Sequence, residues 1–316
     1  MKAHEAPGSR GALTAIVLKM LSVTIFVCMS SLIKAAGTLP AGQIVFFRSF
    51  FAIFPILLFL GFKHELGTAF ATKRPMGHVA RGVIGVCSMA LTFFALTRLP
   101  LPDAITLNYA QPLLVVVFSS IFLGEAVRIY RWSAVVVGLV GVVIISWPEL
   151  TLLTSGSALD DQEVLGVIAA FAGAGCSAIA AILVRNLVHS EKTATIVLWF
   201  SLMASVLALL SLPFGWQPMT WTQALLLIGA GFCGGIAQIF MTSAYRHAEV
   251  STVAPFEYTS MILAIIVGYF AFGDVPTPYM LVGGLIVVGA GIFIIWRERQ
   301  LGLSRGAARR VVSPQG

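Results

Sequence analysis

One arginine interrupts a long apolar segment, in the stretch QIVFFRSFFAIF of residues 43–54. A cation at the centre of a membrane-inserted helix costs roughly 2.5–3.5 kcal/mol, so Arg48 needs a compensating interaction if this segment crosses a membrane. Three interactions would supply it. The guanidinium could coordinate an anionic or carbonyl-rich substrate, pair with an acidic side chain inside a helical bundle, or snorkel towards the surface and cap a backbone carbonyl.

An acidic residue in a second apolar segment is the best partner for this arginine. Glu257 stands in VAPFEYTSM, residues 253–261. At the rise of a helix, Arg48 would lie ~11 Å below the outer surface and Glu257 ~11 Å from the inner surface. The two groups would then differ by only ~8 Å in depth across the hydrocarbon. Glu257 could bind the same substrate as Arg48, form a structural ion pair with it, or carry a coupling proton.

Further polar side chains stand at mid-depth in the predicted spans. Asn108 and Gln111 in TLNYAQPLL are three residues apart and share one helical face. Tyr109 and Tyr258 follow equivalent polar positions and could stack on a planar ligand, or could be packing residues with satisfied hydroxyls. Gln238 could line the inner half of the same path. We expect these residues, with Arg48 and Glu257, to bind the substrate.

The sequence contains no motif for a catalytic, metal-binding or nucleotide-binding site. The five histidines are scattered singly, and there is no HExxH motif, paired-carboxylate motif, GxxxxGK[ST] loop or CxxC pair. The four cysteines fall inside apolar runs, where burial as small apolar residues is the ordinary state. We therefore predict no catalytic residues, no metal site and no cofactor.

The composition places these residues in a membrane. Of 316 residues, 58% are apolar and 10% are charged, whereas about 25% of a soluble domain is charged. Apolar runs long enough to cross ~30 Å of hydrocarbon as helices recur along the chain. A transmembrane barrel would show alternating apolar and polar residues instead. The ten predicted spans cover 12–33, 41–62, 77–97, 102–123, 130–148, 164–186, 193–213, 221–245, 250–272 and 277–296.

The positive charges predict the orientation of these spans. With the N-terminus cytoplasmic, fifteen Lys and Arg residues fall on the inner side and only Lys34 and Arg98 on the outer side. Lys19 and Arg81 lie within spans near their inner ends, where snorkelling explains them. Both termini are therefore predicted to be cytoplasmic. The net charge of +7 is an orientation signal that faces anionic lipid, and it does not indicate a nucleic-acid partner.

The chain contains an internal repeat. The fourth and fifth spans align with the ninth and tenth without gaps at an offset of 149 residues, so that Tyr109 meets Tyr258 and Trp147 meets Trp296. IVFFRS of the second span meets IVLWFS of the seventh, which puts Phe200 at the position of Arg48. Five spans per repeat is an odd number, so the second copy must be inverted in the membrane.

The repeat also predicts the domain organisation. We expect a cytoplasmic tail over 1–11, a five-helix repeat over 12–148, an outer loop over 149–163, a second five-helix repeat over 164–296 and a basic cytoplasmic tail over 297–316. The predicted fold is therefore an all-α integral membrane protein of ten transmembrane helices, arranged as two inverted five-helix repeats.

The chain resembles the EamA group, the bacterial members of the drug/metabolite transporter superfamily. PLLVVVFSSIFLGE at the end of the fourth span, with a weaker GD copy after the ninth, carries this resemblance. It implies a carrier without ATP hydrolysis in the bacterial inner membrane, with a cavity lined by spans 1–4 and 6–9. SLIKAAG and GQIVFFRSFFA are similar to α-proteobacterial members, some of which resemble riboflavin transporters. Riboflavin uptake is thus the most specific expectation, with amino-acid or drug/metabolite export as the alternative and a membrane-embedded enzyme or a channel as other classes.

Overall fold

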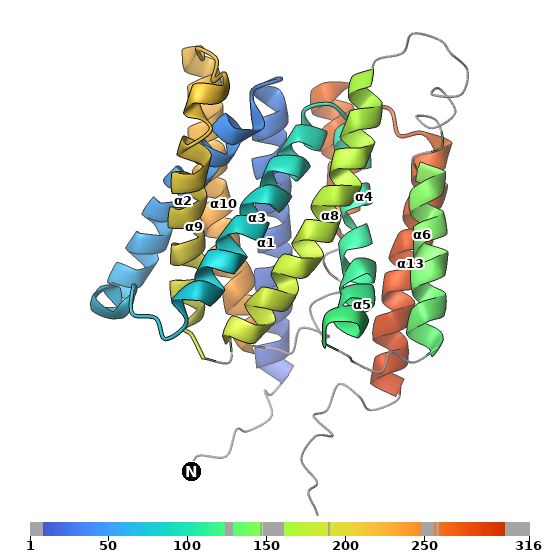
Figure 1. Cartoon of the computed structure of the whole chain (residues 1–316). Helices are drawn as coiled ribbons and strands as arrows, with labels where there is room; N and C mark the ends of the chain where they lie inside the picture. The colour runs from blue at the N-terminus through green and yellow to red at the C-terminus, as the bar shows by residue number, and fades with distance from the viewer. Residues whose placement is uncertain are drawn as a thin grey trace, which may run out of the picture.

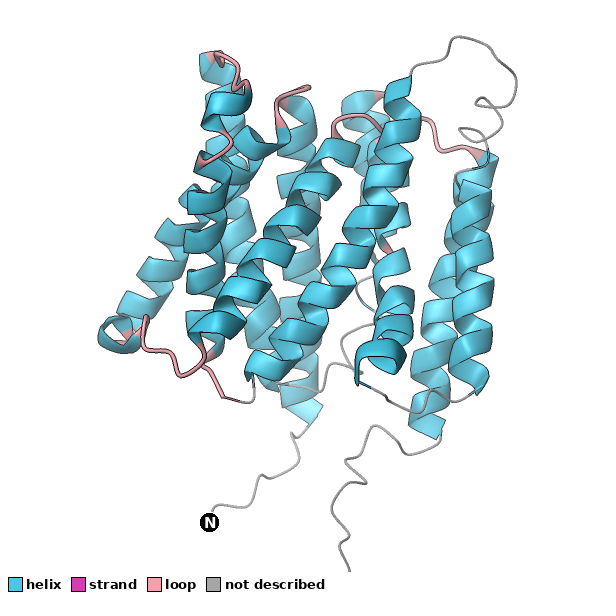
Figure 2. Cartoon of the chain, in the orientation of Figure 1, coloured by secondary structure: helices cyan, strands magenta, loops and turns pink. Residues whose placement is uncertain are grey.

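The computed structural model describes residues 9–123, 129–145, 147, 161–188, 190–247, 256 and 259–300. Every regular element in these ranges is helical, as Figure 2 shows, which confirms the all-α prediction. Glu257, Tyr258, the region around Glu125, most of the predicted outer loop of 149–163 and most of both tails lie outside the described residues.

The helices follow the predicted spans closely. The first half contains α1 (Ser9–Ala35), α2 (Ala41–Phe62), α3 (Pro75–Leu96), α4 (Leu101–Asn108), α5 (Ala110–Leu123) and α6 (Ile129–Ile145). The second half contains α8 (Asp161–Val188), α9 (Thr193–Leu209), α10 (Trp221–His247), α12 (Thr259–Val267), the π-helical turn η4 (Gly268–Phe272) and α13 (Pro278–Gln300). Short 3₁₀ turns, η1 (Leu66–Thr68) and η2 (Leu212–Phe214), follow α2 and α9.

Several of these helices are long and apolar enough to cross a bilayer by themselves. Within the described residues, five helices meet that length and composition, and they lie in α1, α2, α3, α8 and α10. The apolar stretches Trp132–Ile145, Ala194–Leu209, Thr259–Phe272 and Pro278–Ile294 are shorter. α4 and α5 together form the fourth predicted span. The ten-span prediction is confirmed.

The two halves are related by an inverted two-fold arrangement. α1 begins at the face where α13 ends, whereas α8, the first helix of the second half, begins at the opposite face (Figure 1). α1 packs mainly on α10, and α3 packs mainly on α8, so each half presents its first helix to the third helix of the other. The fifth helices, α6 and α13, pack on each other at one end of the bundle (Figure 1).

The fourth span breaks in the middle for a local chemical reason. Pro112 has no N–H to donate to the carbonyl of Asn108, and its ring clashes with that carbonyl in a regular helix. α4 accordingly ends at Asn108 and α5 begins at Ala110, and the N–H of Tyr109 turns to the carbonyl of Thr106, 3.0 Å away. A discontinuous helix at mid-depth is a common feature of transporter folds.

Close packing of α2 against α10 relies on the glycines of GFCGG, residues 231–235. A Cβ on Gly231 would stand 2.5 Å from Cβ of Phe51, and one on Gly235 would stand 2.5 Å from Cγ of Pro55. Larger residues would therefore push the helices apart. The small residues therefore allow this close approach.

Candidate functional site

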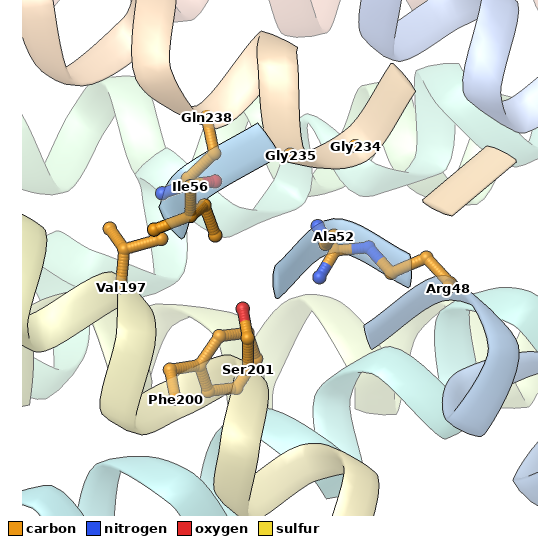
Figure 3. Close-up of a pocket in the computed structure, with 9 residues that line it drawn as sticks. All are labelled: Arg48, Ala52, Ile56, Val197, Phe200, Ser201, Gly234, Gly235 and Gln238. Atoms are coloured by element: carbon orange, nitrogen blue, oxygen red, sulfur yellow. The ribbon is translucent and has the colours of Figure 1, made fainter. Parts of the chain in front are cut away.

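A small cavity lies inside the bundle between α2, α9 and α10 (Figure 3). Its volume is about 10 Å³, which is close to what one water molecule needs. The lining combines one cationic and two neutral polar side chains with apolar residues and glycines. These residues are Arg48, Ala52 and Ile56 of α2, Val197, Phe200 and Ser201 of α9, and Gly234, Gly235 and Gln238 of α10.

Arg48 is the only charged residue among those that line this cavity. The residue is 7% exposed, and no hydrogen-bond partner for its buried Nε is found in the described part of the chain. Among the described residues, no carboxylate forms an ion pair with it. Its burial argues against snorkelling to the surface. The cavity is where a polar ligand atom could reach this guanidinium.

Two other expectations meet at the same place. Gln238, predicted from its mid-depth position in the eighth span, lines the cavity together with Arg48. Phe200 and Ser201, which repeat the positions of Arg48 and Ser49, line it from α9 (Figure 3). Equivalent residues of the second and seventh spans thus surround one space between the two halves.

Arg81 is a second cation at this site, and the sequence prediction for it was wrong. Its Cζ lies 4.0 Å from the centre of the Phe200 ring, so its guanidinium packs inward on an aromatic face and does not snorkel. Among the described residues, no hydrogen-bond partner reaches its buried Nε and Nη1 atoms. Arg81 is close to the cavity because Phe200, on which it packs, lines the cavity together with Arg48. Lys19, assigned to snorkelling as well, is 1% exposed and does not reach the surface.

Two glycines at equivalent positions of the repeats leave room for the side chains of Arg48 and Arg81. Gly82 and Gly85 of α3 repeat as Gly231 and Gly234 of α10 at the offset of 149 residues. A Cβ on Gly234 would stand 3.1 Å from Nε of Arg48. A Cβ on Gly85 would overlap Nη1 of Arg81 and would stand 2.6 Å from Cε2 of Phe200. Gly85 and Gly234 are thus equivalent positions, and each adjoins an arginine side chain.

The polar residues of the broken fourth span lie elsewhere. Asn108, Tyr109 and Gln111 are not among the residues that line this cavity. The hydroxyl of Tyr109 shares a hydrogen bond with that of Ser260 on α12, and the ring is buried in the core. Oδ1 of Asn108 is buried without a partner beside the break. Gln111 is half-buried, and the pairing of Glu257 with Arg48 lies outside the described residues.

The face opposite the chain ends carries an ion pair between the halves that sequence reasoning missed. Nζ of Lys34, at the end of α1, lies 3.5 Å from Oδ2 of Asp274, which follows η4. The same Nζ donates to the carbonyl of Leu99 at 2.7 Å, and Oδ2 of Asp274 accepts from the N–H of Leu101 at 2.9 Å. The network therefore ties the first helix and the α3–α4 connection to the second half.

Metal coordination has no donor cluster in the part of the chain that the structure describes. No group of three or more His, Cys, Asp or Glu side chains converges there. The donors that converge on the cavity are a guanidinium, an amide and a hydroxyl, which suit hydrogen bonding to an organic ligand.

A family model matches nearly the whole chain in two copies. The model of the EamA-like transporter family matches residues 9–147 and again residues 164–297. The chain belongs to the EamA-like transporter family. It is therefore a multi-pass membrane transporter of small molecules and not an enzyme.

Characterised relatives of this family member transport different compounds. It is 31% identical over 283 residues to the pseudopaline exporter of Pseudomonas aeruginosa, covering 88% of this chain and 94% of that protein. It is 29% identical to the S-adenosylmethionine uptake transporter of Rickettsia prowazekii, covering 84% and 87%. It is 30% identical to the riboflavin transporter of Vibrio cholerae, covering 81% and 82%.

The fold of this EamA-like transporter is also found in solved structures. A crystal structure of an 18% identical chain superposes with a TM-score of 0.62 and covers 92% of this chain and 99% of that one. At this identity the similarity shows the fold alone.

Proposed function

We propose that this protein is a secondary carrier that binds a small organic metabolite at the Arg48 cavity and moves it by alternating access. The observation that carries the proposal is the buried guanidinium of Arg48, which lines a cavity between the halves with no counter-charge among the described residues. A charged group inside a membrane bundle is retained where it meets a substrate or an ion. The repeat adds that Phe200 fills the equivalent position, so the fold itself does not require an arginine there.

Alternating access follows from the arrangement of the two halves. Inverted repeats can rock about a site between them and open it to each side in turn. The cavity of about 10 Å³ is far smaller than a metabolite, since ligand sites are typically about 300–1,000 Å³. Binding of a metabolite at this cavity therefore requires the helices around it to move apart.

Two substrate classes fit the polar groups of the cavity. Riboflavin is the specific candidate from the sequence, and two relatives are named as riboflavin transporters. Its carbonyls could accept from the Arg48 guanidinium and the Gln238 amide, although the cavity as described offers no broad aromatic slot. An amino-acid-like metabolite is the alternative, and relatives named for S-adenosylmethionine uptake support it. Its carboxylate would pair directly with Arg48.

We also propose the placement of the chain in the inner membrane of a bacterium. The excess of positive charge on one side supports an orientation with both termini cytoplasmic. The proposed domain limits are those of the two five-helix repeats, 12–148 and 164–296. Glu257 stays a proposal for the coupling site, and Asn108, Tyr109, Gln111 and Tyr258 stay proposals for a wider binding surface in an open state.

Counterflow in proteoliposomes tests this proposal. Purified protein is reconstituted with unlabelled riboflavin or S-adenosylmethionine inside, and uptake of the same labelled compound is followed. A carrier gives saturable uptake that is stimulated by the internal compound. Uptake that rises linearly with concentration and ignores the internal compound would indicate a channel and would contradict the proposal. Protease protection of tags at the two ends checks the orientation.

A further inference from the structure

We propose that Arg48 and Arg81 together form a binding site for one carboxylate of the substrate. The inference rests on the proposed function in one respect, namely that the ligand of this cavity is the transported compound. It goes further by naming the substrate class and by adding Arg81 of α3 to the site. Two guanidinium groups with unpaired buried donors, one lining the cavity and the other packed on the Phe200 ring that also lines it, are suited to a negatively charged oxygen group.

The unsatisfied donors are the first step of the argument. Nε of Arg48 and both Nε and Nη1 of Arg81 are buried, and no residue that the structure describes forms a hydrogen bond with them. Arginine stays charged in proteins, so these N–H groups remain hydrogen-bond donors and are not removed by deprotonation. Buried polar groups are normally hydrogen-bonded, and exceptions call for a missing partner. Arg81 packs on Phe200, which lines the cavity together with Arg48, so oxygen atoms of one ligand bound there are candidate acceptors for these unpaired donors.

Their placement is fixed by the surrounding helices. The ring of Phe200 carries the Arg81 guanidinium at 4.0 Å, and Phe200 itself lines the cavity that contains Arg48. Gly234 and Gly85 leave the room that each arginine side chain occupies. The site is therefore built from α2, α3, α9 and α10, with residues from both halves. A ligand bound there would contact both halves, so its contacts would change when the halves move relative to each other.

The sign of the charge decides between ligand classes. Both guanidinium groups are positively charged and lie beside the cavity that Phe200 lines, so they repel each other, and no described carboxylate pairs with either of them. A neutral carbonyl would accept hydrogen bonds but would leave the repulsion in place. A carboxylate would accept from both guanidinium groups and reduce that repulsion. The remaining lining of Ala52, Ile56 and Val197 is apolar, and it suits the carbon skeleton next to such a group.

Equilibrium binding of a matched pair of probes tests this site without requiring transport. Benzoate and benzamide have nearly the same shape and differ in charge at neutral pH. Full-length protein in lipid nanodiscs is titrated with each, and affinity is read from calorimetry. We expect wild type to prefer benzoate by about tenfold or more, the scale of a charge-assisted hydrogen bond. Equal affinity for the two probes would overturn the proposal by itself.

The variants locate the site. Arg48→Gln and Arg81→Gln are each expected to abolish most of the preference for benzoate, whereas Arg81→Lys should keep part of it because the charge remains. Arg98→Gln is the matched control, since Arg98 already bonds to Gln162 at 2.8 Å outside the cavity. A preference that survives unchanged in both glutamine variants would place the anion elsewhere and refute the assignment.

The outcome is separable from that of the proposed function. Binding of benzoate that depends on both arginines, together with no counterflow of any compound, would keep the anion site and remove the carrier. Saturable counterflow of a neutral compound at wild-type rates in Arg81→Gln would keep the carrier and remove the two-arginine site.

Discussion

Arg48 and Phe200 occupy equivalent positions of the two repeats, and both side chains line one cavity between α2, α9 and α10. The Phe200 ring supports the guanidinium of Arg81. At this position the first half has Arg48, whereas the second half has Phe200. The ring of Phe200 in turn packs against Arg81, which the first half supplies from α3. At this cavity the two repeats have equivalent helices but different side chains. Such an asymmetric lining suits a substrate that lacks two-fold symmetry.

Gly234 sets the position of Arg48, and enlarging it should impair transport more than folding. In Gly234→Ala the new Cβ would stand 3.1 Å from Nε of Arg48 and 3.0 Å from Sδ of Met29, so the guanidinium must shift by a few tenths of an ångström. We expect transport to fall about three- to tenfold, because small misplacements of binding groups are costly. Initial rates of counterflow measure this.

Gly229→Ala is the matched control on the same helix. Its Cβ would meet only Cδ1 of Leu32, at an ordinary 3.5 Å. Wild-type rates in both variants would mean that the position of Arg48 does not matter for transport.

The ion pair of Lys34 and Asp274 should hold one face of the carrier closed. Asp274→Asn removes the charge and keeps an oxygen for the N–H of Leu101. Both side chains are only 16–17% exposed. Because such pairs contribute up to about 1 kcal/mol, the open form should gain about two- to fivefold in population. A single cysteine at position 201, with the native cysteines replaced by serine, should then react faster with an impermeant maleimide added from that face.

The control for this experiment is Glu163→Gln, which removes an exposed acid near the start of α8. It should leave the labelling rate unchanged. A rate that is the same in Asp274→Asn and in the control would show that the pair does not restrain opening.

Much of this architecture could be predicted from sequence, because it depends on properties of single segments. Hydropathy predicted the ten spans. For Arg48 the sequence left substrate binding, an ion pair and snorkelling open, and the structure buries this side chain in the cavity that Gln238 also lines. Substrate binding by either residue stays a prediction. Arg81 was not anticipated, since its direction depends on which face of α3 meets Phe200. Helix phase and packing partners are properties of several segments at once, and a single sequence does not specify them.

The same limit explains the residues of the fourth span. Mid-depth alone suggested that Asn108, Tyr109 and Gln111 would join Arg48. The structure instead places the Tyr109 hydroxyl against Ser260 in the core and leaves all three outside the cavity lining. The pairing of Lys34 with Asp274 joins residues 240 positions apart in the chain, and the charge count had used Lys34 only as a marker of orientation.

A carboxylate in the α8–α9 connection should make stability depend on acid pH. Partial burial raises the pKa of the Glu191 carboxyl, but hydrogen bonds from the Lys73 N–H at 2.7 Å and the Thr72 hydroxyl at 2.9 Å outweigh it, and the pKa is lowered overall. The stabilisation is therefore present above the ordinary pKa of a glutamate and is lost as pH falls through the lowered value. Glu191→Gln should lower the unfolding temperature at pH 7. On acidification, the unfolding temperature of this variant should fall less than that of wild type.

Thermal unfolding in detergent at pH 7 and at about pH 3 measures both effects, the second value lying below the ordinary glutamate pKa. Glu163→Gln serves again as the control, because Glu163 is exposed. Parallel losses in wild type and Glu191→Gln on acidification would contradict the assigned role.

The contact of α6 with α13 should be a structural element that does not bind substrate. A Cβ on Gly283 would stand 2.5 Å from the carbonyl oxygen of Gly141 and 2.6 Å from Cγ1 of Ile145. Gly283→Ala should therefore destabilise the protein by about 1–3 kcal/mol through overpacking. Gly289→Ala on the same helix, with nothing within 4 Å, should be neutral or stabilising. Thermal unfolding that shifts equally in the two variants would argue against close packing at Gly283.

Transport by Arg48→Gln tests the central claim most directly, namely that the Arg48 cavity holds the substrate. Counterflow of labelled riboflavin and of labelled S-adenosylmethionine is compared in wild type, Arg48→Gln and Arg98→Gln at equal reconstituted amounts. Whichever compound the wild type exchanges, we expect Arg48→Gln to lose about tenfold or more in rate, the scale of a lost charge-assisted hydrogen bond, and Arg98→Gln to stay near wild type. Exchange by Arg48→Gln at the wild-type rate would contradict a role for this cavity in transport.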